Sequence, residues 1–164
     1  IKSFKNAVDK IEKYLGNIDF FICSYYLDSI EKDESDVDKL SMNKWDNIFS
    51  DWVESYFLVT KAILPYMLKN ESGKIIFINT TSGYTGEGEG EGQLTEKGSL
   101  YECGCSRAIT GMMTSMARDI IPSGISVNGI ALGPKKGKDR ILNAVLLFLS
   151  GLAEYACGQI IRLY

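Results

Sequence analysis

Few side chains in this sequence could act as nucleophiles or bind metal: among its 164 residues are four cysteines, Cys23, Cys103, Cys105 and Cys157, and no histidine. Without histidine, the chain cannot form the Ser–His or Cys–His pairs that activate many nucleophiles. The cysteines make no Cys-x-x-Cys pair, so we expect no Cys/His zinc site. We expect four buried free thiols in a reducing cytosol. Cys105 has an alternative interpretation as a reactive thiolate, because it lies near a predicted helix start and close to Arg107.

The segment from Gly86 to Gly92 alternates glycine with glutamate. Such a segment has no apolar side chains to pack and its carboxylates repel one another, so it is predicted to be a mobile loop. A phosphate-binding loop is the alternative interpretation. It is disfavoured because three carboxylates would repel the phosphate and no Lys-Ser/Thr pair follows.

Length and composition are those of one ordinary globular domain, with 45% hydrophobic and 24% charged residues. A net charge of -3 argues against a nucleic-acid surface. No apolar run reaches the ~18 residues of a membrane span, and no basic-then-apolar leader signals export. We therefore expect a cytoplasmic protein, folded as a single domain over 1–164, with neither nucleic acid nor membrane as a partner.

Helical and extended patterns alternate along the chain. Helices are predicted where apolar residues recur every three or four positions, and strands where short apolar runs are bounded by turn residues. The predicted helices are 4–15, 41–68, 101–121 and 138–150, and the predicted strands are 18–23, 75–78, 125–131 and 158–163. This order predicts right-handed crossovers and a mostly parallel sheet covered by helices, which is an α/β, doubly wound fold.

The helix over 41–68 has an unusually wide apolar stripe. Ser41 can cap its start, and Pro65 is predicted to kink or end it. The apolar residues are too many for a helix that buries one face only. This pattern indicates burial on two sides, against the sheet and against a partner helix.

Three segments carry a resemblance to a known family: Gly73–Thr80 (GKIIFINT), Tyr101–Ala108 (YECGCSRA) and Ile125–Ala131 (ISVNGIA). In this order they resemble the second half of a short-chain dehydrogenase/reductase, and the resemblance extends over nearly the whole chain. It implies a Rossmann-like, doubly wound sheet that binds NAD(P). It also implies a catalytic group of Ser, Tyr, Lys and Asn.

The resemblance places the catalytic tyrosine at Tyr101 and the catalytic serine at Thr80, with Ser82 as a less favoured alternative. In the family the tyrosine exchanges a proton with the substrate hydroxyl, an ammonium lowers its pKa, and the serine holds the substrate oxygen. The lysine position is Cys105, whose neutral thiol cannot replace an ammonium. The asparagine position is Trp52. These two departures imply that the chemistry is partly lost.

This sequence also departs from the family pattern at the cofactor-binding residues. Its Asn-Asn-Ala-Gly motif is matched by Cys23–Tyr26, where two tyrosines would occupy the space of the adenosine half. Its Pro-Gly is matched by Leu132–Gly133, and its substrate-covering segment is reduced to 134–137. The N-terminal Gly-rich dinucleotide-binding βαβ unit has no counterpart. We therefore expect that this chain binds no cofactor and that NAD(P) is bound by a partner subunit. If the chain is an active enzyme instead, NAD(P) is bound by this chain.

Three functions fit these residues. The first is a non-catalytic, pseudoenzyme subunit that pairs with an active dehydrogenase in a complex acting on a hydroxyl/carbonyl pair. The second is an active NAD(P)-dependent oxidoreductase that uses Tyr101 and Thr80. The third is a module that binds a ligand in the vacated pocket between positions 80, 101 and 132. The resemblance implies a homo- or hetero-oligomer formed through helices 41–68 and 101–121 and through the region 138–163.

Overall fold

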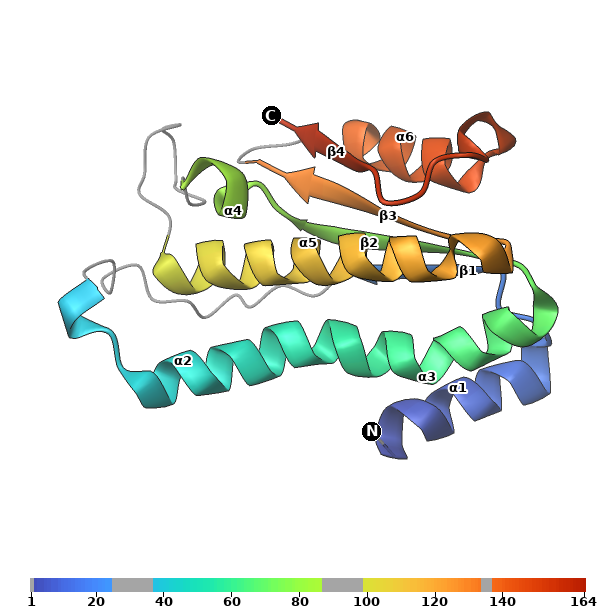
Figure 1. The fold of residues 1–164 in the computed structure, drawn as a ribbon, viewed down its shortest axis with the longest axis horizontal. Helices are drawn as coiled ribbons and strands as arrows, with labels where there is room; N and C mark the ends of the chain where they lie inside the picture. The colour runs from blue at the N-terminus through green and yellow to red at the C-terminus, as the bar shows by residue number, and fades with distance from the viewer. Residues whose placement is uncertain (1, 25–36, 87–98, 134–136) are drawn as a thin grey trace.

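The computed structural model describes residues 2–24, 37–86, 99–133 and 137–164 (Figure 1). Its helices are α1 (Lys2–Leu15), α2 (Met42–Phe49), α3 (Ser55–Asn70), α4 (Ser82–Thr85), α5 (Leu100–Ile120) and α6 (Lys138–Leu149). Its strands are β1 (Phe20–Ser24), β2 (Gly73–Thr80), β3 (Ile125–Leu132) and β4 (Ile160–Leu163). The described elements therefore follow the predicted alternation of helices and strands, with α4 in addition.

The strands form one parallel sheet in the order β1-β2-β3-β4. Ile76 of β2 lies opposite Asn128 of β3, and Gly129 of β3 lies opposite Ile160 of β4. Figure 1 shows α6 on one side of the sheet and α5, α2 and α3 on the other. The predicted α/β architecture, a parallel sheet with helices on both faces, is confirmed.

The core has two parts, one on each face of the sheet. Along β2, Ile75 and Phe77 join the cluster formed with α3 and α5, whereas Ile76 and Ile78 join the cluster formed with α6. Alternate residues of a strand point to opposite faces, so β2 must be apolar on both. This double burial explains why its sequence is a continuous apolar run without a polar alternation.

The last crossover differs in hand from the ones before it. The connections β1-β2, β2-β3 and β3-β4 all step in the same direction across a parallel sheet. The helices α3 and α5 cover one face of that sheet, and α6 covers the other. Two crossovers that step in the same direction across a parallel sheet have opposite hands when their helices lie on opposite faces. The crossovers before α6 have the usual right hand, so the crossover through α6 is left-handed. The expectation of right-handed crossovers throughout is wrong for this connection.

The predicted helix over 41–68 is a continuous helical segment of three parts. A π-helical turn, Ser50–Glu54, joins α2 to α3. Ser41 caps α2 as expected, since its side chain accepts a hydrogen bond from the backbone N–H of Lys44. Pro65 lies inside α3 and does not end it. The carbonyl that a proline leaves unpaired belongs to the residue four positions earlier, here Lys61, whose exposure lets water replace the missing N–H.

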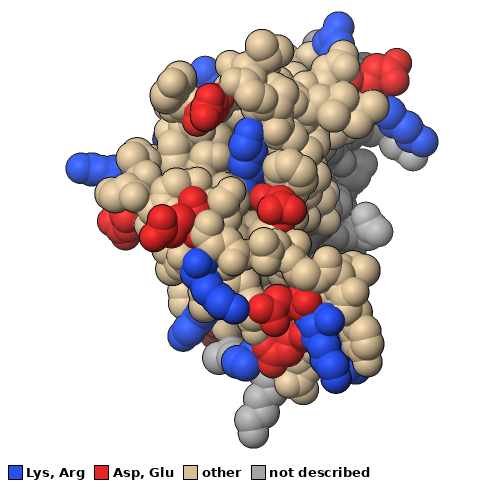
Figure 2. Space-filling view, turned by 90° about the vertical axis from the view of Figure 1, so that its right-hand side faces the viewer, with Lys and Arg blue, Asp and Glu red and all other residues tan. Residues whose placement is uncertain are grey.

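Acidic and basic side chains lie side by side on the end of the molecule shown in Figure 2, in its lower part, where α1 packs against α3. Lys5 pairs with Asp9 at 3.1 Å within α1, and Lys69 of α3 pairs with Glu12 at 3.7 Å. Opposite charges are interspersed there, so this face presents no extended field of one sign. None of the described helices is both long and apolar enough to cross a membrane.

Candidate functional site

The carboxyl end of β2 carries the hydroxyl predicted to hold a substrate oxygen. Thr80 is the last residue of the strand, and its side chain is 4% exposed. Its Oγ1 makes a hydrogen bond with Oγ of Ser82, the first residue of α4. The backbone N–H of Thr81 donates to Leu132 O at 2.7 Å, so the ends of β2 and β3 are joined here. The two hydroxyls proposed as alternatives, Thr80 and Ser82, therefore form one buried pair.

Helix α5 is fastened to this strand end through Ser106. The Ser106 hydroxyl donates to Thr80 O at 2.8 Å, and Asn79 Nδ2 donates to Ser106 O at 2.9 Å. On the α4 side, a Cβ added to Gly83 would come within 2.8 Å of Arg107 N and within 2.9 Å of Ser106 Oγ. Only a glycine lets α4 approach α5 this closely.

Tyr101 lies in the first turn of α5 and makes its recorded contacts with α2. The residue is 0% exposed. Its hydroxyl donates to Ser41 O at 3.4 Å, and its ring centroid lies 5.8 Å from that of Trp45. The Lys44 ammonium lies 5.9 Å from the Tyr101 ring centroid, above the ring. The cation nearest to Tyr101 in these contacts therefore comes from α2 and not from the next turn of α5.

The structure groups the predicted residues in two sets. Thr80 lies with Ser82 and Ser106, and Tyr101 lies with Ser41 and Trp45. Ser106 lies five positions after Tyr101, so its side chain is turned by roughly 140° around the helix. The two sets therefore face different directions around α5, and joint action of Tyr101 and Thr80 on one substrate stays a prediction.

The two positions at which the sequence departs from the family pattern lie in the core. Cys105 and Trp52 are both 0% exposed and belong to the cluster between the sheet, α3 and α5. Burial in these apolar surroundings raises the pKa of the Cys105 thiol to about 12. A reactive thiolate needs a lowered pKa and access to solvent, so the interpretation of Cys105 as a reactive thiolate is wrong. The four cysteines are free thiols, as expected, but only Cys23 and Cys105 are buried; Cys103 and Cys157 are half-buried.

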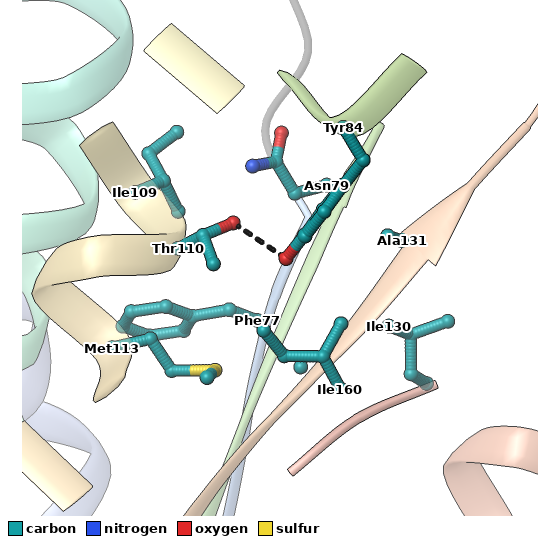
Figure 3. Close-up of a pocket in the computed structure, with 10 residues that line it drawn as sticks. Phe77, Asn79, Tyr84, Ile109, Thr110, Met113, Ile130, Ala131 and Ile160 are labelled. Atoms are coloured by element: carbon teal, nitrogen blue, oxygen red, sulfur yellow. Dashed lines mark hydrogen bonds between the residues drawn. The ribbon is translucent and has the colours of Figure 1, made fainter. Parts of the chain in front are cut away.

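Sequence reasoning missed Ser106, Tyr84 and Arg162. The Tyr84 hydroxyl donates to Thr110 Oγ1 at 3.1 Å (Figure 3). The guanidinium groups of Arg107 and Arg162 lie 4.8 and 5.5 Å from the Tyr84 ring centroid. Arg107 could have been found from its place in the α5 helix. Arg162 could not, because β4 comes to this edge only through the tertiary fold.

Several sequence predictions fall on segments that the structure does not describe. Tyr25 and Tyr26, most of the Gly-Glu segment, and 134–136 lie outside the described residues. Among the described residues, no group of three or more Cys, Asp or Glu side chains could hold a metal ion. A small pocket beside Thr80 is lined by Asn79, Tyr84, Thr110 and their neighbours, and not by the predicted set 80, 101 and 132.

Comparison with known proteins gives a consistent result. The family model described as short chain dehydrogenase matches residues 1–139. The 3-oxoacyl-(acyl-carrier-protein) reductase of Escherichia coli (strain K12) is 25% identical over 131 residues, which cover 80% of this chain and 48% of that protein. The reductase of the same name from Thermotoga maritima is 25% identical over 182 aligned positions, covering 96% and 69%. This chain thus spans about half the length of the Escherichia coli relative.

Solved structures show the same fold at lower identity. A short-chain dehydrogenase/reductase from Burkholderia xenovorans superposes with a TM-score of 0.83 at 19% identity, covering 99% of this chain and 68% of that one. A gluconate 5-dehydrogenase from Burkholderia cenocepacia J2315, in complex with NADP and tartrate, gives a TM-score of 0.81 at 17% identity, covering 98% and 68%. About a third of each of these chains has no counterpart here.

Proposed function

Since this chain belongs to the short chain dehydrogenase family, we propose that it is a non-catalytic subunit, which pairs with an active dehydrogenase in a complex acting on a hydroxyl/carbonyl pair. The proposal has two parts, loss of chemistry and retention of pairing surfaces. Each part is supported by different residues and is tested by a different measurement.

The observation that carries the loss of chemistry is Cys105. It occupies the position of the family's lysine, one helical turn after Tyr101, at 0% exposure. Because burial raises its thiol pKa to about 12, the side chain is neutral at physiological pH and supplies no positive charge to a neighbouring phenol. Trp52, at the position of the family's asparagine, is likewise 0% exposed. A buried indole cannot take over the hydrogen bonds of a carboxamide, which has two donors and an acceptor.

The surfaces of α3 and α5 support pairing. On α3, Phe57, Leu64 and Leu68 recur at helical spacing, and Phe57 and Leu68 are 47% and 41% exposed. On α5, Met112 and Met116 are half-buried. On α6, Leu142 and Leu146 are 53% and 52% exposed. Apolar stripes on helices that already bury another face are typical of subunit interfaces.

The catalytic part is tested with the purified chain alone, incubated with NADH or NADPH and a panel of aldehydes and ketones. We expect no oxidation of either cofactor and no saturable binding of either in a fluorescence titration. An intact relative, the Escherichia coli reductase, serves as the positive control. Turnover that scales with the concentration of this chain and disappears in Tyr101→Phe would overturn the proposal.

The pairing part is tested by co-expressing the chain with dehydrogenases of its own genome. We expect one of them to elute with this chain as a complex of defined stoichiometry in size-exclusion chromatography with light scattering. Substitution of Phe57 by aspartate should release the partner. Formation of homo-oligomers only, together with carbonyl reduction by them, would contradict this part.

The alternative function, an active NAD(P)-dependent oxidoreductase, is favoured by one observation. Thr80 keeps a hydroxyl at the carboxyl end of β2, in a hydrogen-bonded pair with Ser82, where ligands bind in open α/β sheets. If this function holds, Thr80→Val should abolish turnover and Ser82→Ala should reduce it less. The same assay would then contradict the proposal of a non-catalytic subunit.

A further inference from the structure

A groove of about 600 Å³ runs along the outer side of α5, beside β4. Tyr84 of α4, Ile160 of β4 and the α5 stripe from Arg107 to Arg118 line it. It lies on the face of the sheet covered by α5, where Arg162 follows Ile160 two residues later along β4. The groove is separate from the contacts of Tyr101, which face α2.

Two arginines contact the aromatic ring of Tyr84, which lines the groove; Arg107 lines it as well, and Arg162 lies beside it. The guanidinium carbons of Arg107 and Arg162 lie 4.8 and 5.5 Å from the Tyr84 ring centroid, so the two groups are no further apart than the sum of these distances. Both side chains are exposed. Neither has an ion pair with any described residue. Two cations on one ring, neither of them paired with a carboxylate of the described residues, make the local potential positive, which favours the binding of an anion there.

The inner wall of the groove adjoins a small pocket with an unsatisfied polar atom. Asn79 is 9% exposed, and its Oδ1 has no hydrogen-bond partner among the described residues. The pocket, about 10 Å³, has room for roughly one water, and it shares Tyr84, Thr110 and Ile160 with the groove. Figure 3 shows the Tyr84 hydroxyl directed at Thr110 inside it. Because Asn79 Oδ1 is an acceptor, this pocket suits a water or a donor group of the ligand, and the anion itself would be held by the arginines.

Its place in the fold is that of a ligand site. Tyr84 belongs to the short helix that follows β2, and Arg162 lies one residue before the end of β4. Both are at the carboxyl edge of a parallel sheet, where α/β folds bind their ligands. This edge, rather than the electrostatics alone, distinguishes Arg107 and Arg162 from an ordinary pair of surface arginines.

We propose that Arg107 and Arg162 bind the phosphate group of a phosphorylated ligand at this groove. A phosphate monoester carries close to two negative charges at neutral pH, which matches the two guanidinium groups. Guanidinium forks bind phosphate oxygens in pairs. The remainder of the ligand lies along α5 toward Arg118. This site does not depend on the proposed function, because it uses neither Tyr101 nor Thr80.

The test is calorimetric titration of the purified chain with inorganic phosphate and with methyl phosphate, at constant ionic strength. We expect saturable binding that weakens about tenfold or more in Arg107→Gln and in Arg162→Gln. Arg107→Lys keeps the charge but loses the fork, so its loss should be intermediate. Lys10→Gln removes an equal charge on α1 and should bind as the wild type does. Unfolding midpoints of all variants check that each is folded.

The pattern of results decides both the site and its ligand. Equal affinity for methyl phosphate and inorganic phosphate identifies the phosphate as one end of a larger ligand, whereas binding of inorganic phosphate alone identifies the free ion. Absence of saturable binding to the folded wild type overturns the proposal. Equal weakening in Lys10→Gln and Arg107→Gln also overturns it, since binding would then follow net charge only.

Discussion

Ser106 is the side chain that fixes α5 against the sheet. Its hydroxyl donates to Thr80 O at 2.8 Å with the residue at 0% exposure. Ser106→Ala removes this donor from a buried acceptor, which should lower the free energy of unfolding by about 1–3 kcal/mol. Thr114→Ala is the matched control, because the Thr114 hydroxyl makes a similar bond, to Thr110 O, at an exposed position. That variant should stay within about 0.5 kcal/mol of the wild type. Urea unfolding curves measure both, and equal losses would contradict the role of Ser106.

Cys105 makes stability depend on pH. Its thiol pKa rises from an ordinary 9.0 to about 12 in the folded protein. The folded state therefore keeps a proton that the unfolded state loses above pH 9.0, and the stabilisation is complete below that pH and is lost as the pH rises toward 12. The destabilisation caused by Cys105→Ala should accordingly be smaller at about pH 10.5 than at about pH 8. Urea unfolding of both proteins at the two pH values measures this difference, and a constant difference would show that folding does not raise the pKa of Cys105.

Sequence spacing could predict part of this site and not the rest. It placed Tyr101 and Cys105 one turn apart on the same helix, and the structure keeps both of them buried. It could not predict which neighbour that face of α5 contacts. The rotation of α5 about its own axis is set by long-range packing of Tyr101 on Trp45 and by the bond from Ser106 to Thr80. Both contacts join segments that are far apart in the chain.

Helix α4 can pack on α5 only because residue 83 is a glycine. A Cβ at Gly83 would lie 2.8 Å from Arg107 N and 3.1 Å from Cys103 O, both of them backbone atoms that cannot move aside without shifting α5. Gly83→Ala should therefore displace α4 and lower the unfolding midpoint by several degrees. Gly111 of α5, which has nothing within 4 Å of an added Cβ, provides the control. Gly111→Ala should raise the stability by about 0.5–1 kcal/mol through helix propensity. Thermal unfolding that changes equally in the two variants would contradict this account.

The elements themselves were predictable because their signals are local. The apolar run of β2 and the cap at Ser41 can be recognised within a few residues of sequence, and both are confirmed. The hand of the last crossover was not predictable. It depends on which face of the sheet the earlier helices cover. Helix α5, which precedes α6 in the chain, covers one face, and α6 packs on the other. The effect of Pro65 also depends on solvent exposure, which the local sequence does not determine.

At the scale of the whole molecule, apolar side chains are exposed on the outer side of α3. Helix α3 is apolar almost all round: one stripe lies in the core, Leu64 is half-buried against it, and Phe57 and Leu68 are exposed on the outer side. Lys61, between them, lies over the Phe57 ring at 5.6 Å. A helix that buries only one face would present polar side chains here. If the proposed pairing holds, we expect Phe57 and Leu68 to be covered by the partner subunit.

This surface gives a direct test of assembly. If the outer side of α3 is buried between subunits, the double variant Phe57→Asp/Leu68→Asp must desolvate two carboxylates on association. Association should weaken by at least about a hundredfold. Light scattering after size-exclusion chromatography should then give the 18.2 kDa monomer where the wild type gives a multiple of it. Tyr14→Asp is the control, since Tyr14 is 74% exposed on α1, outside this surface. A wild type that stays monomeric at high concentration and in the presence of its dehydrogenase partner, or a double variant that assembles as the wild type does, would place the interface elsewhere.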